Sequence, residues 1–200
     1  MMNPEQAVES RPKFPEIAAE IIRMAEEDQA ERFRVFNDPD LMADPEKRRV
    51  IIVSIDARNT DRLDRIIADI GWPSISKVGP EASTNAWLIA QHADEDPSFQ
   101  ERCLELMKAE HAGEVEKQNI AYLEDRVMEK KEGVQIYGTQ FEIDGSGNYG
   151  PKPIKDPENL EERRRTMGME SFQEYREGRM RWWEENKHRY ANFHKRESED

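Results

Sequence analysis

Residues 80–106, PEASTNAWLIAQHADEDPSFQERCLEL, contain two helix starts separated by a short connection. Pro80 suits the first position of a helix that should run through Ala93. Asp96 followed by Pro97 is typical of the cap and first residue of a second helix. The apolar face of that second helix is formed by Phe99, Cys103 and Leu106. Because the connection is short, the two helices should lie antiparallel, which favours a mainly α-helical fold.

Helical periodicity extends to both sides of this pair. Long helices are expected over residues 15–36 and 119–131. The apolar run of residues 50–55, VIIVSI, fits either a buried strand or a turn of helix, and periodicity does not decide between them. Residues 59–70 should form a further helix that ends at a glycine. Its cap is expected to be Asn59 or Thr60.

The helical pattern breaks once, in residues 134–154. The run VQIYGTQFEI, the turn residues DGSGN and the run YGPKPI together predict a β-hairpin, in which the prolines confine the second strand to an edge. Helical patterns then resume. We therefore expect a mainly α protein, a single helical domain of about six to seven helices with one β-hairpin. The expected organisation is a flexible segment (1–13), the helical domain (14–170), and an aromatic helix with a charged tail (171–200).

The composition is acidic, with 43 acidic and 30 basic residues and a formal charge of -13. This charge opposes binding to nucleic acid and to anionic membranes, and no apolar run approaches the roughly 20 residues needed to span a bilayer. The first residues lack the features of a secretory signal, and the single cysteine fits a reducing compartment. We expect a soluble, cytoplasmic protein that binds neither nucleic acid nor membrane.

Common catalytic signatures are missing from the sequence, which has no Gly-rich phosphate loop and no HExxH, CxxC or GxSxG motif. The informative residues are polar ones at positions where helical periodicity expects apolar ones. Asp28 falls in line with Ile21 and Met24, so its carboxylate should be buried or face a pocket. On the helix that starts at residue 80, Glu81 and His92 fall within about 20° of each other.

An imidazole beside a carboxylate is a common way to place a general base near neutral pH. One interpretation is therefore a catalytic site in which His92 moves a proton and either Glu81 or Asp28 orients it. The alternative is a core histidine with satisfied hydrogen bonds and a Glu81 that only favours the helix dipole. The catalytic interpretation requires Asp28, Glu81 and His92 to converge from two separate helices.

Two other features point away from metal and thiol chemistry. In HADED (92–96), His92, Asp94 and Asp96 resemble metal ligands in their spacing. Because Asp96 is needed as a helix cap, the remaining pair offers too few ligands, and we expect no metal and no cofactor. Cys103 lies on an apolar helical face and should be a core residue rather than a nucleophile.

A series of motifs carries a family resemblance. The motifs are EEDQAERF (26–33), GWP (71–73), VGPEAS (78–83), AWLIAQHADEDPSFQ (86–100), AYLEDRV (121–127), QIYGTQF (135–141) and RRRTMGM (163–169). As a set they resemble an uncharacterised bacterial domain-of-unknown-function family, which implies no activity. The resemblance marks Asp28, Gln29, Arg32, Trp72, Gln91, His92, Asp94, Asp125, Arg126, Tyr137 and Gln140.

These marked positions extend the catalytic hypothesis to a small-molecule enzyme with a polar pocket around the histidine. Arg32 or Arg126 would hold an anionic group, Gln91 and Gln140 would position the substrate, and Tyr137 would donate a hydrogen bond. For Arg126 a structural salt bridge is the alternative. The rival hypothesis is a noncatalytic protein-interaction or structural module, in which the polar residues form a buried network that fixes helix packing.

The C-terminal segment gathers aromatic side chains on one face of an expected helix. They are Phe172, Tyr175, Trp182, Trp183, Tyr190 and Phe193. One interpretation is that the helix packs this face across the core as a closing strap. The alternative is a docking surface for a second subunit, which would make the protein a homodimer, because tryptophan and tyrosine dominate interface energetics.

Overall fold

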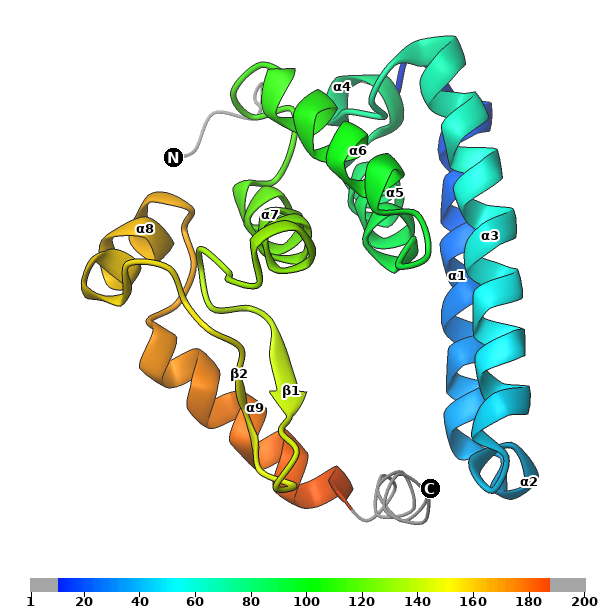
Figure 1. The fold of residues 1–200 in the computed structure, drawn as a ribbon. Helices are drawn as coiled ribbons and strands as arrows, with labels where there is room; N and C mark the ends of the chain where they lie inside the picture. Colours follow the sequence, from blue (N-terminus) through cyan, green and yellow to red (C-terminus); the bar gives the residue numbers. More distant parts are fainter. Residues whose placement is uncertain (1–10, 188–200) are drawn as a thin grey trace, which may run out of the picture.

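The computed structural model describes residues 11–187 and shows a mainly α-helical domain with one β-hairpin, as the sequence predicts (Figure 1). These residues contain nine α-helices, more than expected because two of them have only four residues. None of the described helices is both long and apolar enough to cross a bilayer.

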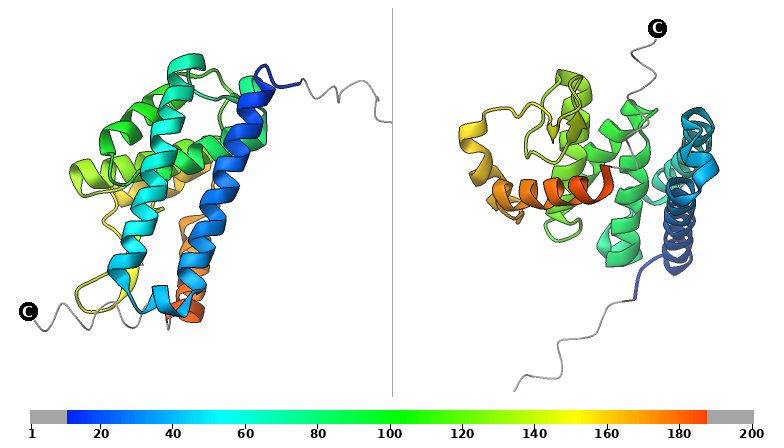
Figure 2. Two further views of the ribbon diagram at one scale, coloured as in Figure 1. Left: turned by 90° about the vertical axis from the view of Figure 1, so that its right-hand side faces the viewer. Right: turned by 90° about the horizontal axis from the view of Figure 1, so that it is seen from below.

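Two long antiparallel helices, α1 (Pro15–Asn37) and α3 (Pro45–Ile70), form one side of the molecule. They lie next to each other along their length in Figure 2, and the short α2 (Pro39–Met42) joins them. The first helix thus matches the expected residues. The side chain of Asp38 accepts hydrogen bonds from two backbone amides at the start of α2, which stabilises the turn.

The second long helix differs from the prediction. Residues 50–55 are helical, and α3 continues through Asn59 and Thr60, so the helix start expected there is wrong. The cap is instead Asp44, whose side chain accepts a hydrogen bond from the amide of Lys47. Tertiary packing explains the difference, because α3 packs against both α1 and α5 and Asn59 itself is buried, so the local cap signal does not start a helix there.

Four further helices build the centre of the domain: α4 (Ile75–Val78), α5 (Pro80–His92), α6 (Pro97–Ala109) and α7 (Lys117–Glu132). Helix α5 packs against α1 and α3 on one side and against α6 and α7 on the other. The core runs through this contact and includes fully buried Ile21, Leu63 and Leu123. Asp96 caps α6 by accepting from the amide of Phe99 at 3.0 Å, as predicted.

The β-hairpin is shorter than the sequence pattern suggests. Strands β1 (Phe141–Ile143) and β2 (Tyr149–Pro151) pair antiparallel, whereas residues 134–140 form a loop over α7. The chain then continues through a 3₁₀ turn, η1 (Pro157–Asn159), into the short helix α8 (Leu160–Thr166) and the last described helix, α9 (Phe172–Asn186).

Helix α9 lies along the hairpin (Figure 1). The ring of Tyr175 meets the ring of Phe141 edge to face at a centroid distance of 5.9 Å. Trp183 stacks on Tyr149 at 4.8 Å, whereas Trp182 is 40% exposed. Part of the aromatic face therefore covers the hairpin. Tyr190 and Phe193, which belong to the predicted face, lie outside the described residues.

Candidate functional site

Three helices bring Asp28, Asp56 and His92 together. Asp28 comes from α1, Asp56 from α3, and His92 is the last residue of α5. One potential ligand atom from each of the three lies within 4.8 Å of the others. Asp28 is only 1% exposed, so its carboxylate is buried, as its alignment with Ile21 and Met24 predicts.

The carboxylate of Asp28 is the centre of the cluster. Its Oδ2 accepts hydrogen bonds from Arg32 Nε at 3.0 Å and Gln29 Nε2 at 2.9 Å. His92 Nδ1 lies 3.0 Å from the same oxygen, an ion-pair distance without hydrogen-bond alignment. Burial acts to raise the pKa of Asp28, but contacts with His92 and Arg32 outweigh it and hold the pKa below its ordinary value. The carboxylate is therefore ionised at neutral pH.

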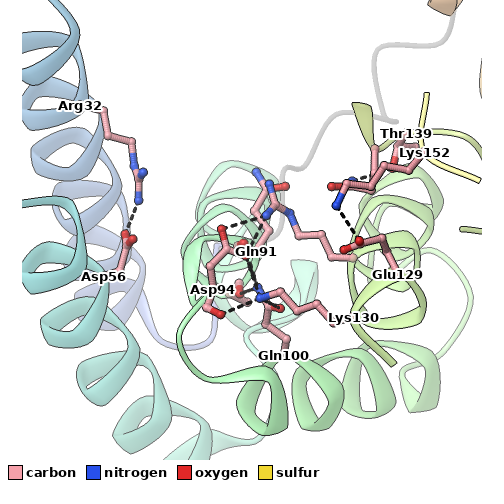
Figure 3. Close-up of polar contacts among 12 residues, drawn as sticks. Arg32, Asp56, Gln91, Asp94, Gln100, Glu129, Lys130, Thr139 and Lys152 are labelled. Carbon is pink, nitrogen blue, oxygen red and sulfur yellow. Dashed lines mark hydrogen bonds and ion pairs between the residues drawn. The ribbon is translucent and has the colours of Figure 1, made fainter. Parts of the chain in front are cut away.

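Arg32 links this carboxylate to a second one. Its guanidinium also contacts Asp56 Oδ1, across the α1 and α3 interface (Figure 3). Burial raises the pKa of Asp56 to about 6, although the positive charge of Arg32 acts in the opposite direction. The negative charges of Asp28 and Asp94 add to the increase. The site thus contains one carboxylate that stays ionised and one that changes protonation close to neutral pH.

Solvent reaches this cluster from one side. The side chains of Arg32, Asp56 and His92 are 19%, 11% and 16% exposed, whereas that of Asp28 is 1% exposed. A cavity of about 390 Å³ lies next to α3, and its lining includes Asp56, Thr60, Ala93 and Phe99. A small molecule in this cavity would contact the Asp56 carboxyl group and Ala93, the residue that follows His92.

Glu81 does not belong to the cluster, so the predicted convergence with Asp28 and His92 is wrong for this residue. It lies exposed in the first turn of α5, at the opposite end from His92. Eleven residues separate the two, which is about 16 Å along a helix. Periodicity predicts which face a residue occupies but not its height along the axis, and the cluster forms only at the C-terminal end of α5.

The other polar residues of HADED turn toward different partners. Asp94 accepts from Arg126 NH1 at 2.9 Å and from Lys130 Nζ at 3.0 Å (Figure 3). Asp96 caps α6, and His92 faces Asp28. Arg126 is thus engaged in a salt bridge from α7. Gln91 contributes its backbone carbonyl, which accepts from Gln100 Nε2 at 3.0 Å, and this contact ties the end of α5 to α6.

A separate polar network shapes the loop of residues 134–140. Buried Asp125 on α7 accepts from the backbone amides of Ile136, Tyr137 and Thr139 at 2.6, 2.7 and 2.8 Å. Burial raises the pKa of Asp125, although these amides act in the opposite direction. The three hydrogen bonds explain why the loop does not continue the strand, because its amides are already paired.

Tyr137 and Gln140 have local partners within this network. The hydroxyl of Tyr137 donates to Glu124 at 3.2 Å, and Gln140 Nε2 donates to Thr139 Oγ1 at 2.9 Å. Figure 3 shows Thr139 far from Asp56, on the other side of the residues that surround Asp94. The structure therefore gives no contact between these two predicted residues and the cluster at Asp28.

Cys103 is fully buried in the core, and burial raises its pKa to about 12. This environment fits a core residue, because a thiol needs a lowered pKa to act as a nucleophile at neutral pH.

Asp56 is the member of the cluster that the sequence pattern did not indicate. It lies seven residues, or about two turns, before fully buried Leu63, so on one continuous helix both share a face. If a new helix is assumed to start at residue 59 or 60, Asp56 and Leu63 do not belong to the same helix and share no face. The available signal was therefore a carboxylate on the same helical face as the buried apolar residues of α3. Only an interpretation of α3 as one continuous helix could use this signal.

Comparison with known proteins supplies a family but no activity. A protein-family model, described as a family of unknown function (DUF6624), matches residues 15–183. Neither the curated proteins nor the solved structures contain a match.

Proposed function

The chain belongs to the DUF6624 family, whose function is unknown, and we propose that it is a small-molecule enzyme with acid–base chemistry at Asp28, Asp56 and His92. The observation that carries this proposal is the contact between a buried, ionised carboxylate and an imidazole, in a cluster whose third member, Asp56, lines a cavity. His92 Nδ1 lies 3.0 Å from Asp28 Oδ2, so the carboxylate fixes the orientation of the imidazole ring. The second ring nitrogen is then the group that exchanges a proton with substrate.

Asp56 takes the place that the sequence hypothesis assigned to Glu81. A carboxyl group with a pKa of about 6 is suited to donate or accept a proton near neutral pH. It also lines the cavity of about 390 Å³, which is large enough for a small metabolite. We assign Asp56 as the second proton-transfer group and Asp28 as the residue that positions His92.

The five predicted substrate-binding residues differ in how well their positions fit the proposed site. Gln91 and Arg126 lie near the end of α5 and remain candidates for contacts with substrate, although Asp94 already engages Arg126. Arg32 is bound to two carboxylates, so an anionic substrate group would compete with Asp28 and Asp56 for it. We leave Tyr137 and Gln140 out of the proposed site, because their hydrogen-bond partners belong to the Asp125 network.

A thermal-shift screen with a metabolite library tests the proposal, with EDTA present so that metal ions do not contribute. A true ligand at 100 times its dissociation constant should stabilise the wild-type protein by about 2.7 kcal/mol. The shift should disappear in His92→Gln and Asp56→Asn. The matched control is His111→Gln, because His111 is an exposed histidine outside the site. A ligand that stabilises all four proteins equally would place binding elsewhere and contradict the proposal.

The rival function, a noncatalytic module with a buried polar network, also has a specific observation in its favour. Arg32 joins Asp28 on α1 to Asp56 on α3, so the same residues cross-link two long helices. In that case His92→Gln should lower the free energy of unfolding by several kcal/mol. No metabolite should then stabilise the wild-type protein more than the variant.

A further inference from the structure

The residues at the centre of the site are metal-ligand types. Two carboxylates and one imidazole offer potential ligand atoms that lie within 4.8 Å of one another. Ligand atoms on opposite sides of a divalent ion are about 4.2 Å apart, since each lies about 2.1 Å from the ion. Small side-chain rotations would therefore bring all three atoms onto one ion.

A second, independent observation is that polar atoms in the cluster lack hydrogen bonds. Asp28 Oδ1 is buried and has no hydrogen-bond partner among the described residues. His92 Nδ1 is also buried without an aligned hydrogen bond, despite its 3.0 Å approach to Asp28 Oδ2. An unpaired oxygen on an ionised carboxylate is costly, and coordination to a cation would satisfy it.

From these observations we propose that Asp28, Asp56 and His92 bind one divalent transition-metal ion. An imidazole nitrogen with two carboxylates favours Zn²⁺, Mn²⁺ or Fe²⁺ over Ca²⁺ and Mg²⁺, which prefer oxygen ligands alone. Three protein ligands leave coordination positions open for water or substrate, as in catalytic metal sites. Of the three ligands, Asp56 lines the neighbouring cavity, from which water or substrate would approach.

Arg32 is the internal competitor for this ion. Its guanidinium contacts both carboxylates, so it supplies the positive charge that the ion would supply. Metal binding must therefore displace at least part of the Arg32 contact. Arg32→Gln removes the competing charge and keeps a polar, though shorter, side chain, so the variant should bind the ion more tightly than wild type.

This inference rests on the proposed function for the location of the site and deepens it. With the ion bound, His92 and Asp56 would act as ligands, and a coordinated water with a lowered pKa would take over proton transfer. It differs from the site considered in HADED, because it replaces Asp94 and Asp96 by two carboxylates from other helices.

Cobalt titration of the full-length protein, made without a histidine tag and stripped with EDTA, tests the inference. Co²⁺ gives visible absorption that depends on its ligands, and calorimetry with Zn²⁺ gives the stoichiometry. We expect one ion per chain, with affinity reduced about a hundredfold or more in His92→Gln and Asp56→Asn. His111→Gln should bind as wild type does. Arg32→Gln should bind about tenfold more tightly, a gain that an unfolded variant could not produce.

Two outcomes would overturn the metal site. One is an absence of stoichiometric binding in both wild type and Arg32→Gln. The other is binding that His111→Gln weakens as much as His92→Gln does, which would indicate surface histidines. Either result leaves the acid–base proposal standing, because the metabolite screen is performed in EDTA. Conversely, metal binding without a metabolite ligand, both in EDTA and in a second screen with the ion added back, would support the ion site and count against the enzyme.

Discussion

At Asp56, burial and electrostatic attraction act in opposite directions, and burial prevails. The pKa rises from the ordinary 3.8 to about 6, even though Arg32 contacts the carboxylate. Asp28 shows the reverse balance, because the contacts with His92 and Arg32 together lower its pKa. The two carboxylates therefore share one arginine and still differ in pKa, a division that suits acid–base catalysis.

The raised pKa makes the stability contribution of Asp56 depend on pH. Between about pH 4 and pH 6 the folded chain holds this proton more tightly than the unfolded chain, so the free energy of unfolding falls as pH rises through that window. Asp56→Asn mimics the protonated form. It should unfold at higher urea than wild type near pH 7.5, by up to about 3 kcal/mol, and like wild type near pH 4.

Asp61→Asn is the matched control for this experiment, because Asp61 is an exposed carboxylate on the same helix. It should change stability little at either pH. If Asp56→Asn is instead less stable than wild type near neutral pH, the Arg32 ion pair outweighs burial and the assigned protonation is wrong.

At the scale of elements, the loop before β1 determines where α9 can lie. Asp125 binds three amides of this loop, and Gly138 within it has a φ of 78°. A Cβ atom at Gly138 would lie 2.7 Å from the ring of Phe172, the first residue of α9. The glycine is therefore needed for both backbone conformation and close packing.

Gly138→Ala should destabilise the protein through strain and through this clash. The matched control is Gly113→Ala, since Gly113 has a φ of 89° but a Cβ atom there would have no neighbour within 4 Å. The control should cost about 1 kcal/mol, whereas Gly138→Ala should cost about 1–3 kcal/mol more and expose the aromatic rings of α9. Urea unfolding with tryptophan fluorescence measures both effects. Equal losses in the two variants would mean that α9 adjusts freely.

At the scale of the whole molecule, α9 closes the hairpin end of the domain. Tyr175 and Trp183 pack on β1, β2 and α7, while Trp182 remains 40% exposed. These contacts place part of the aromatic face on the hairpin and on Tyr122 of α7, and a strap across the core stays a prediction. The homodimer stays a prediction, and two members of the predicted aromatic face, Tyr190 and Phe193, lie outside the described residues.

Truncation after Glu170 separates the two interpretations of this segment. If α9 is a strap, removal exposes Phe141, Tyr149 and Tyr122, so the shortened protein should be insoluble or lose its cooperative melting transition. Size-exclusion chromatography and thermal unfolding provide the measurements. A shortened chain that stays folded and monomeric, compared with a dimeric full-length protein, would favour docking instead.

Local signals in the sequence were sufficient for features that depend on neighbouring residues. The N-cap Asp96, the start of α1 at Pro15 and the end of α7 at Gly133 follow from side-chain hydrogen bonds and backbone preferences within a few residues. The burial of Asp28 follows equally from periodicity, because one helical face must turn inward.

Contacts between distant segments required the tertiary structure. The continuity of α3 depends on packing against α1 and α5, which overrides the cap signal at Asn59. Asp56 could join Asp28 and His92 only on that continuous helix. Glu81 is not part of the cluster because it lies at the other end of α5 from His92. Periodicity specifies a direction around each helix axis, but the position along that axis where helices meet is decided by packing of the whole chain.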